Sequence, residues 1–151
     1  MSTRTSKAKA GTARAVPEDA CPSCGTMMTP SRAIMRLPVN GEEVTVRGIP
    51  HLRCPNCAEG LLGLEQVRLF RQTAFEVYRT KYALLGPAEI RGLREALGLT
   101  QAAMAKLLRL GGNTISRWEA GRNVQTAAMD VLLRMLRDLP GSVAYLKKRA
   151  A

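Results

Sequence analysis

The chain has 151 residues, of which 46% are hydrophobic and 4% aromatic, and its formal net charge is +11. This length suits one domain or two small ones, and no segment approaches the roughly 18 consecutive apolar residues of a membrane-spanning helix. No apolar run follows the first basic residues, so no secretory signal is predicted. We therefore expect a cytoplasmic protein in a reducing compartment, where disulfides are rare.

The charge is distributed unevenly along the chain. Residues 1–17 carry four basic residues and no acidic one, without hydrophobic periodicity, which predicts a disordered basic tail. Residues 18–60 carry four arginines and five acidic residues, whereas residues 86–151 carry eleven basic and five acidic residues. The basic C-terminal part is therefore the candidate for binding a polyanion, and the nearly neutral N-terminal part is expected to have a different partner.

Four cysteines form two identical Cys-Pro-x-Cys pairs, Cys21 with Cys24 and Cys54 with Cys57. Two such pairs supply four thiolates in a tetrahedron, which is the ligand set of a closed structural zinc site. We expect one Zn²⁺ per chain. Because no coordination position is left for water, the ion is predicted to organise a small domain rather than to catalyse a reaction.

Three alternatives to this site are weaker. Two disulfides are disfavoured in a reducing compartment, and a redox Cys-x-x-Cys motif would need a βαβ pattern that surrounds neither pair. His51 lies three residues before Cys54 and is a possible substitute ligand. With four cysteines present, we expect His51 to be an ordinary strand or loop residue. No nucleophile accompanies it, so no enzymatic activity is predicted.

A β-hairpin is predicted between the two cysteine pairs. Residues 31–37 and 42–48 flank the turn at residues 38–41, which ends in Asn40-Gly41. Asn-Gly is the strongest short hairpin signal, since both residues tolerate a positive φ. A short extended segment at residues 49–53 then leads to the second pair. A unit of roughly 40 residues is too small to hold its own core, so zinc is expected to supply much of its folding free energy.

Residues 61–85 are predicted to form a helix that links the two halves. Apolar residues recur there mostly at intervals of three and four, as on one face of a helix, and charged residues that are expected to face solvent lie between them. The apolar positions are Leu64, Val67, Phe70, Ala74, Val77 and Tyr78, and the charged ones are Arg68, Arg71, Glu76 and Arg79. Gly86-Pro87 ends this segment and places a proline at the start of the next helix.

Residues 86–151 are predicted to form five short helices. They are expected at residues 87–97, 100–109, 113–120, 126–139 and 142–149, separated by glycine- or proline-containing turns. The second and third, joined at Gly111-Gly112, read as a helix-turn-helix. The predicted fold class is α+β with two domains. A β-rich zinc domain at residues 18–60 and a linking helix at 61–85 precede an all-α five-helix domain at 86–151.

The third of these helices has two residues that are suited to reading DNA bases. Asn113 and Arg117 are four residues apart and therefore share one face of the helix. In the major groove, an asparagine side chain can hydrogen-bond to adenine and an arginine side chain to guanine. The alternatives are an N-cap role for Asn113 and a solvated surface position for Arg117. Further residues are predicted to contact the DNA backbone or to support the readers, namely Thr100, Gln101, Thr114, Ser116 and Arg122.

These segments resemble known families. Leu99-Thr100-Gln101, followed by Ile-Ser-Arg-Trp-Glu-Ala-Gly at residues 115–121, resembles the repressor/Cro-like helix-turn-helix. Together with the two upstream cysteine pairs, residues 20–147 resemble an MqsA-type antitoxin with a YgiT-type zinc finger. The order of zinc domain, linker and helix-turn-helix makes this second resemblance the more specific one.

The resemblance implies a function. In that family the zinc domain binds a cognate toxin, typically an endoribonuclease, and the C-terminal domain dimerises and binds a palindromic operator. An asparagine and an arginine four residues apart read bases there, and Asn113 and Arg117 match that spacing. The chain is thus expected to be a repressor and antitoxin. The alternative is a stand-alone zinc-containing regulator without a toxin. An RNA-processing accessory role is disfavoured, because residues 18–60 contain no aromatic residue.

Overall fold

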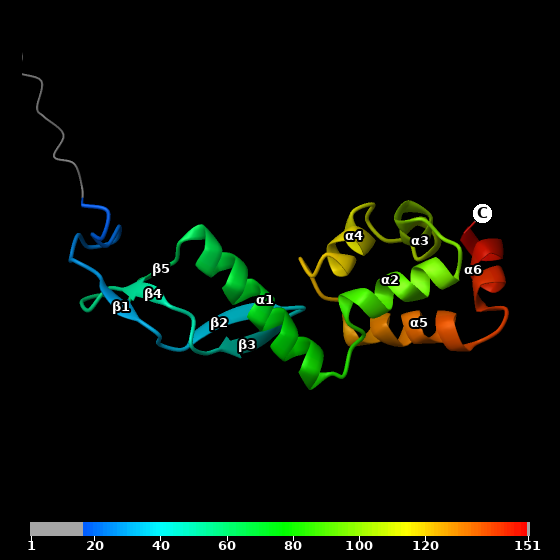
Figure 1. The fold of residues 1–151 in the computed structure, drawn as a ribbon, viewed down its shortest axis with the longest axis horizontal. Helices are drawn as coiled ribbons and strands as arrows, with labels where there is room; N and C mark the ends of the chain where they lie inside the picture. Colours follow the sequence, from blue (N-terminus) through cyan, green and yellow to red (C-terminus); the bar gives the residue numbers. More distant parts are fainter. Residues whose placement is uncertain (1–16, 151) are drawn as a thin grey trace, which may run out of the picture.

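The computed structural model describes residues 17–150, so the basic tail predicted at residues 1–17 lies outside the described part apart from Pro17. The molecule is elongated, with a strand-rich N-terminal region at one end and a helical C-terminal region at the other (Figure 1). One long helix, α1, Leu64–Lys81, lies beside the strands and leads toward the helical end. In the described part, no helix is both long and apolar enough to cross a membrane.

The strands form two small antiparallel sheets. The first has the order β1-β4-β5, from Thr29–Ser31, His51–Arg53 and Gly60–Leu61. The second is the hairpin of β2, Met35–Val39, and β3, Glu42–Val46. The sequence places Ser31 in the first hairpin strand, but the structure puts it in β1, where it pairs with His51.

The hairpin turn has the predicted Asn-Gly geometry. Asn40 and Gly41 have φ values of 50° and 83°, the left-handed conformation that a two-residue turn needs and that these two residues tolerate best. Val39 pairs with Glu42 across the turn. The turn is therefore shorter than the four residues predicted, because Pro38 and Val39 stay in the strand. Val44 and Val46 are buried, and the residue between them faces outward.

Helix α1, Leu64–Lys81, packs its C-terminal half against the hairpin. Ala74, Phe75 and Tyr78 are buried, whereas Leu64 and Val67 are exposed. The first half of the helix therefore lies beyond the hairpin, and its apolar periodicity does not produce burial there.

The expectation that Arg79 faces solvent is wrong, because this residue is only 6% exposed. Its guanidinium is paired with Glu76 of the preceding helical turn. Arg79 lies next to Tyr78 at the end of α1 that packs on the hairpin. The tertiary packing of that end overrides the local charge pattern.

The helical region follows the predicted boundaries closely. Gly98 and Gly121, with φ values of 65° and 67°, follow the ends of two of its helices, as expected for C-terminal glycines. Thr100 and Thr126 accept hydrogen bonds from backbone amides three residues on and so cap the helices that follow them. The helices are α2, Pro87–Ala96; α3, Gln101–Leu107; α4, Thr114–Glu119; α5, Ala127–Asp138; and α6, Ser142–Ala150.

Three apolar clusters hold the described chain together. The largest lies within the helical region and includes Met104, Ile115 and Leu133. The second joins the hairpin to α1, and it also contains Val124, from the segment between α4 and α5. The third is small and surrounds two buried cysteines, Cys21 and Cys54. The second cluster thus joins the strand-rich region to the helical region through side-chain packing.

Candidate metal centre and nucleic-acid interface

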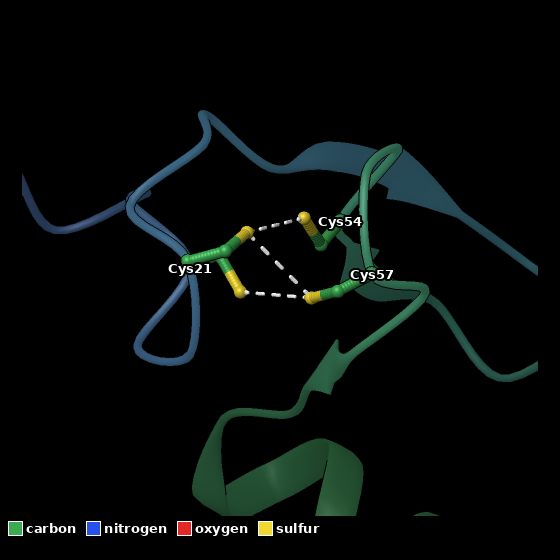
Figure 2. A group of neighbouring side chains, drawn as sticks. Cys21, Cys54 and Cys57 are labelled. Atoms are coloured by element: carbon green, nitrogen blue, oxygen red, sulfur yellow. Dashed lines mark hydrogen bonds between the residues drawn. The ribbon is translucent and has the colours of Figure 1, made fainter.

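The four cysteines converge at the end of the strand-rich region. Their sulfur atoms all lie within 4.8 Å of one another, although 29 residues separate the two pairs along the chain. Three of the sulfur–sulfur distances are 3.5 Å for Cys21–Cys57, 3.4 Å for Cys24–Cys54 and 3.7 Å for Cys24–Cys57. Figure 2 shows the sulfurs pointing toward one another from the two loops.

The two cysteine loops share one backbone hydrogen bond and one left-handed residue at equivalent positions. In the first, the amide of Gly25 donates to the carbonyl of Cys21 at 2.8 Å, and in the second the amide of Ala58 donates to that of Cys54 at 3.0 Å. The residue after the second cysteine has a positive φ in both loops, 73° at Gly25 and 61° at Ala58. Each loop therefore directs its two thiols to the same side.

This arrangement fits one tetrahedral metal ion. With metal–sulfur bonds of about 2.3 Å, the sulfurs of a tetrahedron lie about 3.8 Å apart, close to the distances observed. All four cysteines are free thiols, so neither pair forms a disulfide. His51 is not part of this group, and its Nδ1 lies 2.9 Å from the carbonyl oxygen of Ile49. The four cysteines can hold one metal ion with a full set of protein ligands.

The thiols differ in acidity. Hydrogen bonds with the side chain and the backbone of Thr26 lower the pKa of Cys24 to about 5. At Cys57 a backbone hydrogen bond with Glu59 lowers the pKa, but the hydrogen bond with Cys21 and burial outweigh it and raise the pKa to about 12. A metal ion binds all four sulfurs as thiolates, so its binding releases protons from this cluster.

The candidate base-reading residues lie on an accessible face of α4. Asn113 is exposed and Arg117 is accessible, while Ile115 and Trp118 on the opposite side are buried in the helical core. Asn113 occupies the N-cap position, but its side chain makes no capping hydrogen bond. Within the described part of the chain, no hydrogen bond or ion pair engages the side chain of either candidate. Both side chains are thus available to a ligand.

The supporting candidates have defined local roles. The Thr100 hydroxyl accepts from the amide of Ala103 at 3.0 Å, and the Ser116 hydroxyl donates to the carbonyl of Asn113 at 3.0 Å. Gln101 Nε2 donates to Glu119 Oε2 at 2.8 Å, so part of its amide is already engaged inside the protein. Thr114 is half-buried, and Arg122 is exposed shortly after the end of α4.

Sequence reasoning missed the residues that fix α4 in place. Glu119 is buried and accepts two hydrogen bonds from Arg94 of α2, at 2.6 and 3.1 Å. Burial alone raises the pKa of Glu119, but the hydrogen bonds from Arg94 and Gln101 outweigh it and lower that pKa below the usual value. The sequence could have indicated that Glu119 is buried, because it lies four residues after the core residue Ile115 and therefore on the same face of the helix.

A second missed interaction joins the hairpin to the helical region. The side-chain amide of Asn40 donates to the carbonyl oxygens of Val124 and Gln125, at 3.4 and 3.2 Å. Gln125 Nε2 in turn donates to the carbonyl of Leu85 at 2.8 Å and to Asp130 Oδ1 at 3.0 Å. An interaction between residues more than 80 positions apart leaves no local signal in the sequence.

Comparison with known proteins gives consistent matches. A family model described as "Antitoxin component of bacterial toxin-antitoxin system, MqsA" matches residues 19–146. A segment of 62 residues is 27% identical to the antitoxin HigA-2 of Vibrio cholerae serotype O1. That segment is 41% of this chain and 60% of HigA-2, so the alignment spans less than two thirds of that relative.

Proposed function

The chain belongs to the MqsA family of antitoxins from bacterial toxin–antitoxin systems, and we propose that it is a DNA-binding repressor that also binds a toxin. In this proposal α3 and α4 act as a helix-turn-helix, and α4 enters the major groove. Asn113 and Arg117 read bases, and Thr100, Gln101, Thr114, Ser116 and Arg122 contact phosphates or support the readers.

One observation carries the DNA-binding proposal. The polar face of α4 presents Asn113 and Arg117 with no protein partner in the described residues, on a helix that the buried Glu119 fixes to the rest of the fold. An N-cap role for Asn113 finds no support, because its side chain makes no capping hydrogen bond. Residues 86–151 also carry eleven basic and only five acidic residues, a balance that favours binding to a polyanion such as DNA.

Specific DNA binding is tested with Arg117→Ala. The probe is the promoter DNA directly upstream of the chain's own gene, with a scrambled duplex of equal length as the competitor. The variant should lose about 1–3 kcal/mol of specific binding free energy and keep its affinity for scrambled DNA. Arg36→Ala, on the exposed side of the hairpin, is the control. Equal specific binding by Arg117→Ala and the wild type would remove this residue from the base-reading set.

We propose that the protein binds DNA as a homodimer through its helical region. Apolar side chains are exposed on α5 and α6, among them Val131, Met135 and Tyr145. Met135 and Tyr145 line a groove of about 420 Å³ between these helices. A second copy would cover this surface and would place two α4 helices in successive major grooves, about 34–36 Å apart. Met135→Lys should yield a monomer in analytical ultracentrifugation and should weaken operator binding.

The proposed metal is Zn²⁺, one ion per chain. Four thiolates in a closed tetrahedron are the ligand set that structural zinc prefers, and the ion supplies folding free energy when bound. The cysteines hold it, and the hydrogen bond within each loop keeps a pair of thiols oriented. Metal analysis of reduced protein should find one zinc per chain, and a β1-β4-β5 sheet that folds without any bound metal would contradict this assignment.

The proposed toxin partner is a small basic endoribonuclease encoded next to this chain, and it binds the strand-rich region. Residues 18–60 have one more acidic than basic residue, and Met27, Ile34 and Leu61 are exposed in or next to this segment. A groove of about 500 Å³ lies in the same region and is lined partly by Leu52 and Leu61. Co-expression of the full chain with the neighbouring gene product tests the pairing. If the two proteins do not associate, the stand-alone regulator is the better description.

A further inference from the structure

A second groove of the helical region lies between α3, α5 and α6. Its volume is about 470 Å³, within the range of roughly 300–1,000 Å³ that small-molecule sites usually have. Four leucines line it, and they are buried or half-buried, whereas the two arginines that also line it are exposed. The groove thus combines an apolar interior with positive charge at its exposed edge. The lining residues are Leu107, Leu108, Arg109, Leu132, Leu146 and Arg149.

The acidic residues of the three surrounding helices do not neutralise these arginines. Helices α3 and α6 contain no acidic residue, and they add three lysines to this end of the molecule. The acidic residues of α5, Asp130 and Asp138, are each paired with an arginine of that same helix. Within the part of the chain that the structure describes, no ion pair involves Arg109 or Arg149. Both positive charges at the groove are therefore free to attract an anion.

Arg109 occupies a backbone position that normally favours glycine. It comes directly after Leu108, the C-cap of α3, and its φ of 55° is left-handed. At the equivalent positions after α2 and α4 the chain has Gly98 and Gly121. A side chain disfavours this conformation, so the turn itself does not select an arginine. The arginine instead contacts α6, because its Nη2 donates to the carbonyl of Arg149 at 2.7 Å.

This contact with α6 does not exhaust the binding capacity of Arg109. The end of a helix carries a partial negative charge of about one half, which is less than the full charge of a guanidinium. The hydrogen bond also takes only one of the five N–H donors of the arginine. The Arg149 guanidinium lies 5.1 Å from the centre of the Tyr145 ring, a contact that supplies no counter-ion. Both guanidinium groups therefore keep donors for a ligand.

We propose that this groove binds a small amphipathic anion, namely a carboxylate with an unbranched hydrocarbon chain. The hydrocarbon chain packs on the leucines, and the carboxylate accepts hydrogen bonds from Arg109 and Arg149. Guanidinium groups suit this ligand because their planar fork can bind both carboxylate oxygens at once. The six lining residues offer neither an aromatic ring nor an amide side chain, so they favour a plain hydrocarbon over a base or a sugar. This inference does not depend on the proposed DNA binding.

The groove shares one wall with the proposed dimer surface. Leu132 and Leu146 also line the groove of about 420 Å³ that contains Met135 and Leu139. In contrast, Arg109 lines only the larger groove, and Leu139 lines only the smaller one. A bound ligand can therefore be assigned to one groove or the other by the residues that the two do not share.

The test titrates decanoate, kept below the concentration at which it forms micelles, into the zinc-loaded full-length protein. Calorimetry measures its affinity, and amide NMR shifts should be largest at Leu107 and Arg109 and small at Leu139. Arg109→Gly should weaken binding about tenfold, as expected when hydrogen bonds to a charged group are lost. Its thermal stability should not fall, since glycine suits the left-handed turn. Arg137→Gln removes one charge from exposed α5, and this control should bind decanoate like the wild type.

The ligand provides a second measurement. Decanol, the neutral analogue, should bind the wild type about tenfold more weakly than decanoate, and this preference should disappear in Arg109→Gly. Butyrate keeps the carboxylate but lacks most of the hydrocarbon chain, and its binding should be too weak to detect. Arg109→Lys keeps the charge and should retain most of the affinity for decanoate.

Three results would overturn the inference. Equal decanoate affinity for Arg109→Gly, Arg137→Gln and the wild type would show that binding reflects only the overall positive charge. Largest NMR shifts at Met135 and Leu139 would place the ligand in the proposed dimer groove. Conversion of the ligand-free protein to a monomer by Arg109→Gly, measured by analytical ultracentrifugation, would identify the groove as an interface between two copies of the chain.

Discussion

The Arg94 guanidinium holds the Glu119 carboxylate in a two-pronged ion pair, with Nε to Oε1 at 2.6 Å and Nη2 to Oε2 at 3.1 Å. The Glu119 side chain is 1% exposed and that of Arg94 13%, so water hardly screens the pair. Arg94 Nη1 also donates to the carbonyl of Leu99 at 2.9 Å. One buried carboxylate thus ties α4 to α2 and, through Gln101, to α3.

Removing the charge of Glu119 should destabilise the fold strongly. Glu119→Gln keeps the shape but leaves the Arg94 guanidinium without its counter-charge, so we expect a loss of about 3 kcal/mol in the free energy of unfolding. Urea titration monitored by the fluorescence of Trp118 measures this change. Glu95→Gln is the matched control, since Glu95 is an exposed partner of the same arginine at 3.5 Å. Equal effects of the two substitutions would contradict the anchoring role.

The Glu119 carboxylate also makes the free energy of unfolding depend on pH under acidic conditions. Hydrogen bonds outweigh burial and lower the folded-state pKa of Glu119, and the same balance lowers that of Asp130. Their contribution is fully present above the unfolded carboxyl pKa of about 4 and is lost as pH falls through the lower folded pKa values. The free energy of unfolding should therefore fall steeply below about pH 4. The fall should be smaller in Glu119→Gln, and identical pH curves would refute this assignment.

Metal removal should unfold only part of the strand-rich region. The cluster around Cys21 and Cys54 is small, whereas the hairpin packs on α1 in a separate and larger cluster. Chelation, or Cys54→Ser, should abolish the β1-β4-β5 sheet and leave the hairpin, α1 and the helical region folded. Two-dimensional amide NMR spectra resolve these regions separately. Loss of dispersed signals from α2–α6 would show that the metal stabilises the whole chain instead.

Ala58→Gly should stabilise the metal-bound protein. Ala58 has a φ of 61°, a left-handed conformation that costs a residue with a side chain about 1 kcal/mol or more. Its counterpart in the first loop is already a glycine with a φ of 73°. A gain of about 1 kcal/mol is expected in chemical unfolding of the zinc-loaded protein. Gly25→Ala is the mirror-image control and should lose a similar amount.

Asn40→Gly should loosen the packing of the hairpin on the helical region. Glycine keeps the left-handed turn at residue 40, so the change removes the two bonds to Val124 and Gln125 without straining the hairpin. Amide hydrogen exchange in residues 121–126 should become about tenfold faster, as expected when two hydrogen bonds are removed. Exchange in α2 should be unchanged. Unaltered exchange in residues 121–126 would show that Val124 packing alone maintains this junction.

Much of the local structure follows from the sequence. The Cys-Pro-x-Cys spacing indicates the metal-binding group, Asn40-Gly41 indicates the hairpin turn, and Thr100 and Thr126 mark where helices begin. Each of these signals depends on the covalent chemistry and the backbone preferences of a few adjacent residues. The grouping of the four cysteines and the helix positions could therefore be predicted before any interaction between distant residues was known.

The sequence by itself determined the four-cysteine group, the hairpin, the order of the helices, and the polar face with Asn113 and Arg117. Only the tertiary structure decided that Arg79 is buried, that Glu119 is held by Arg94, and that Val124 packs with the hairpin. It also brought Arg109 and Arg149 to one groove. The physical reason is that periodicity specifies which face of a helix is apolar. Which distant segment covers that face depends on packing among all the elements at once.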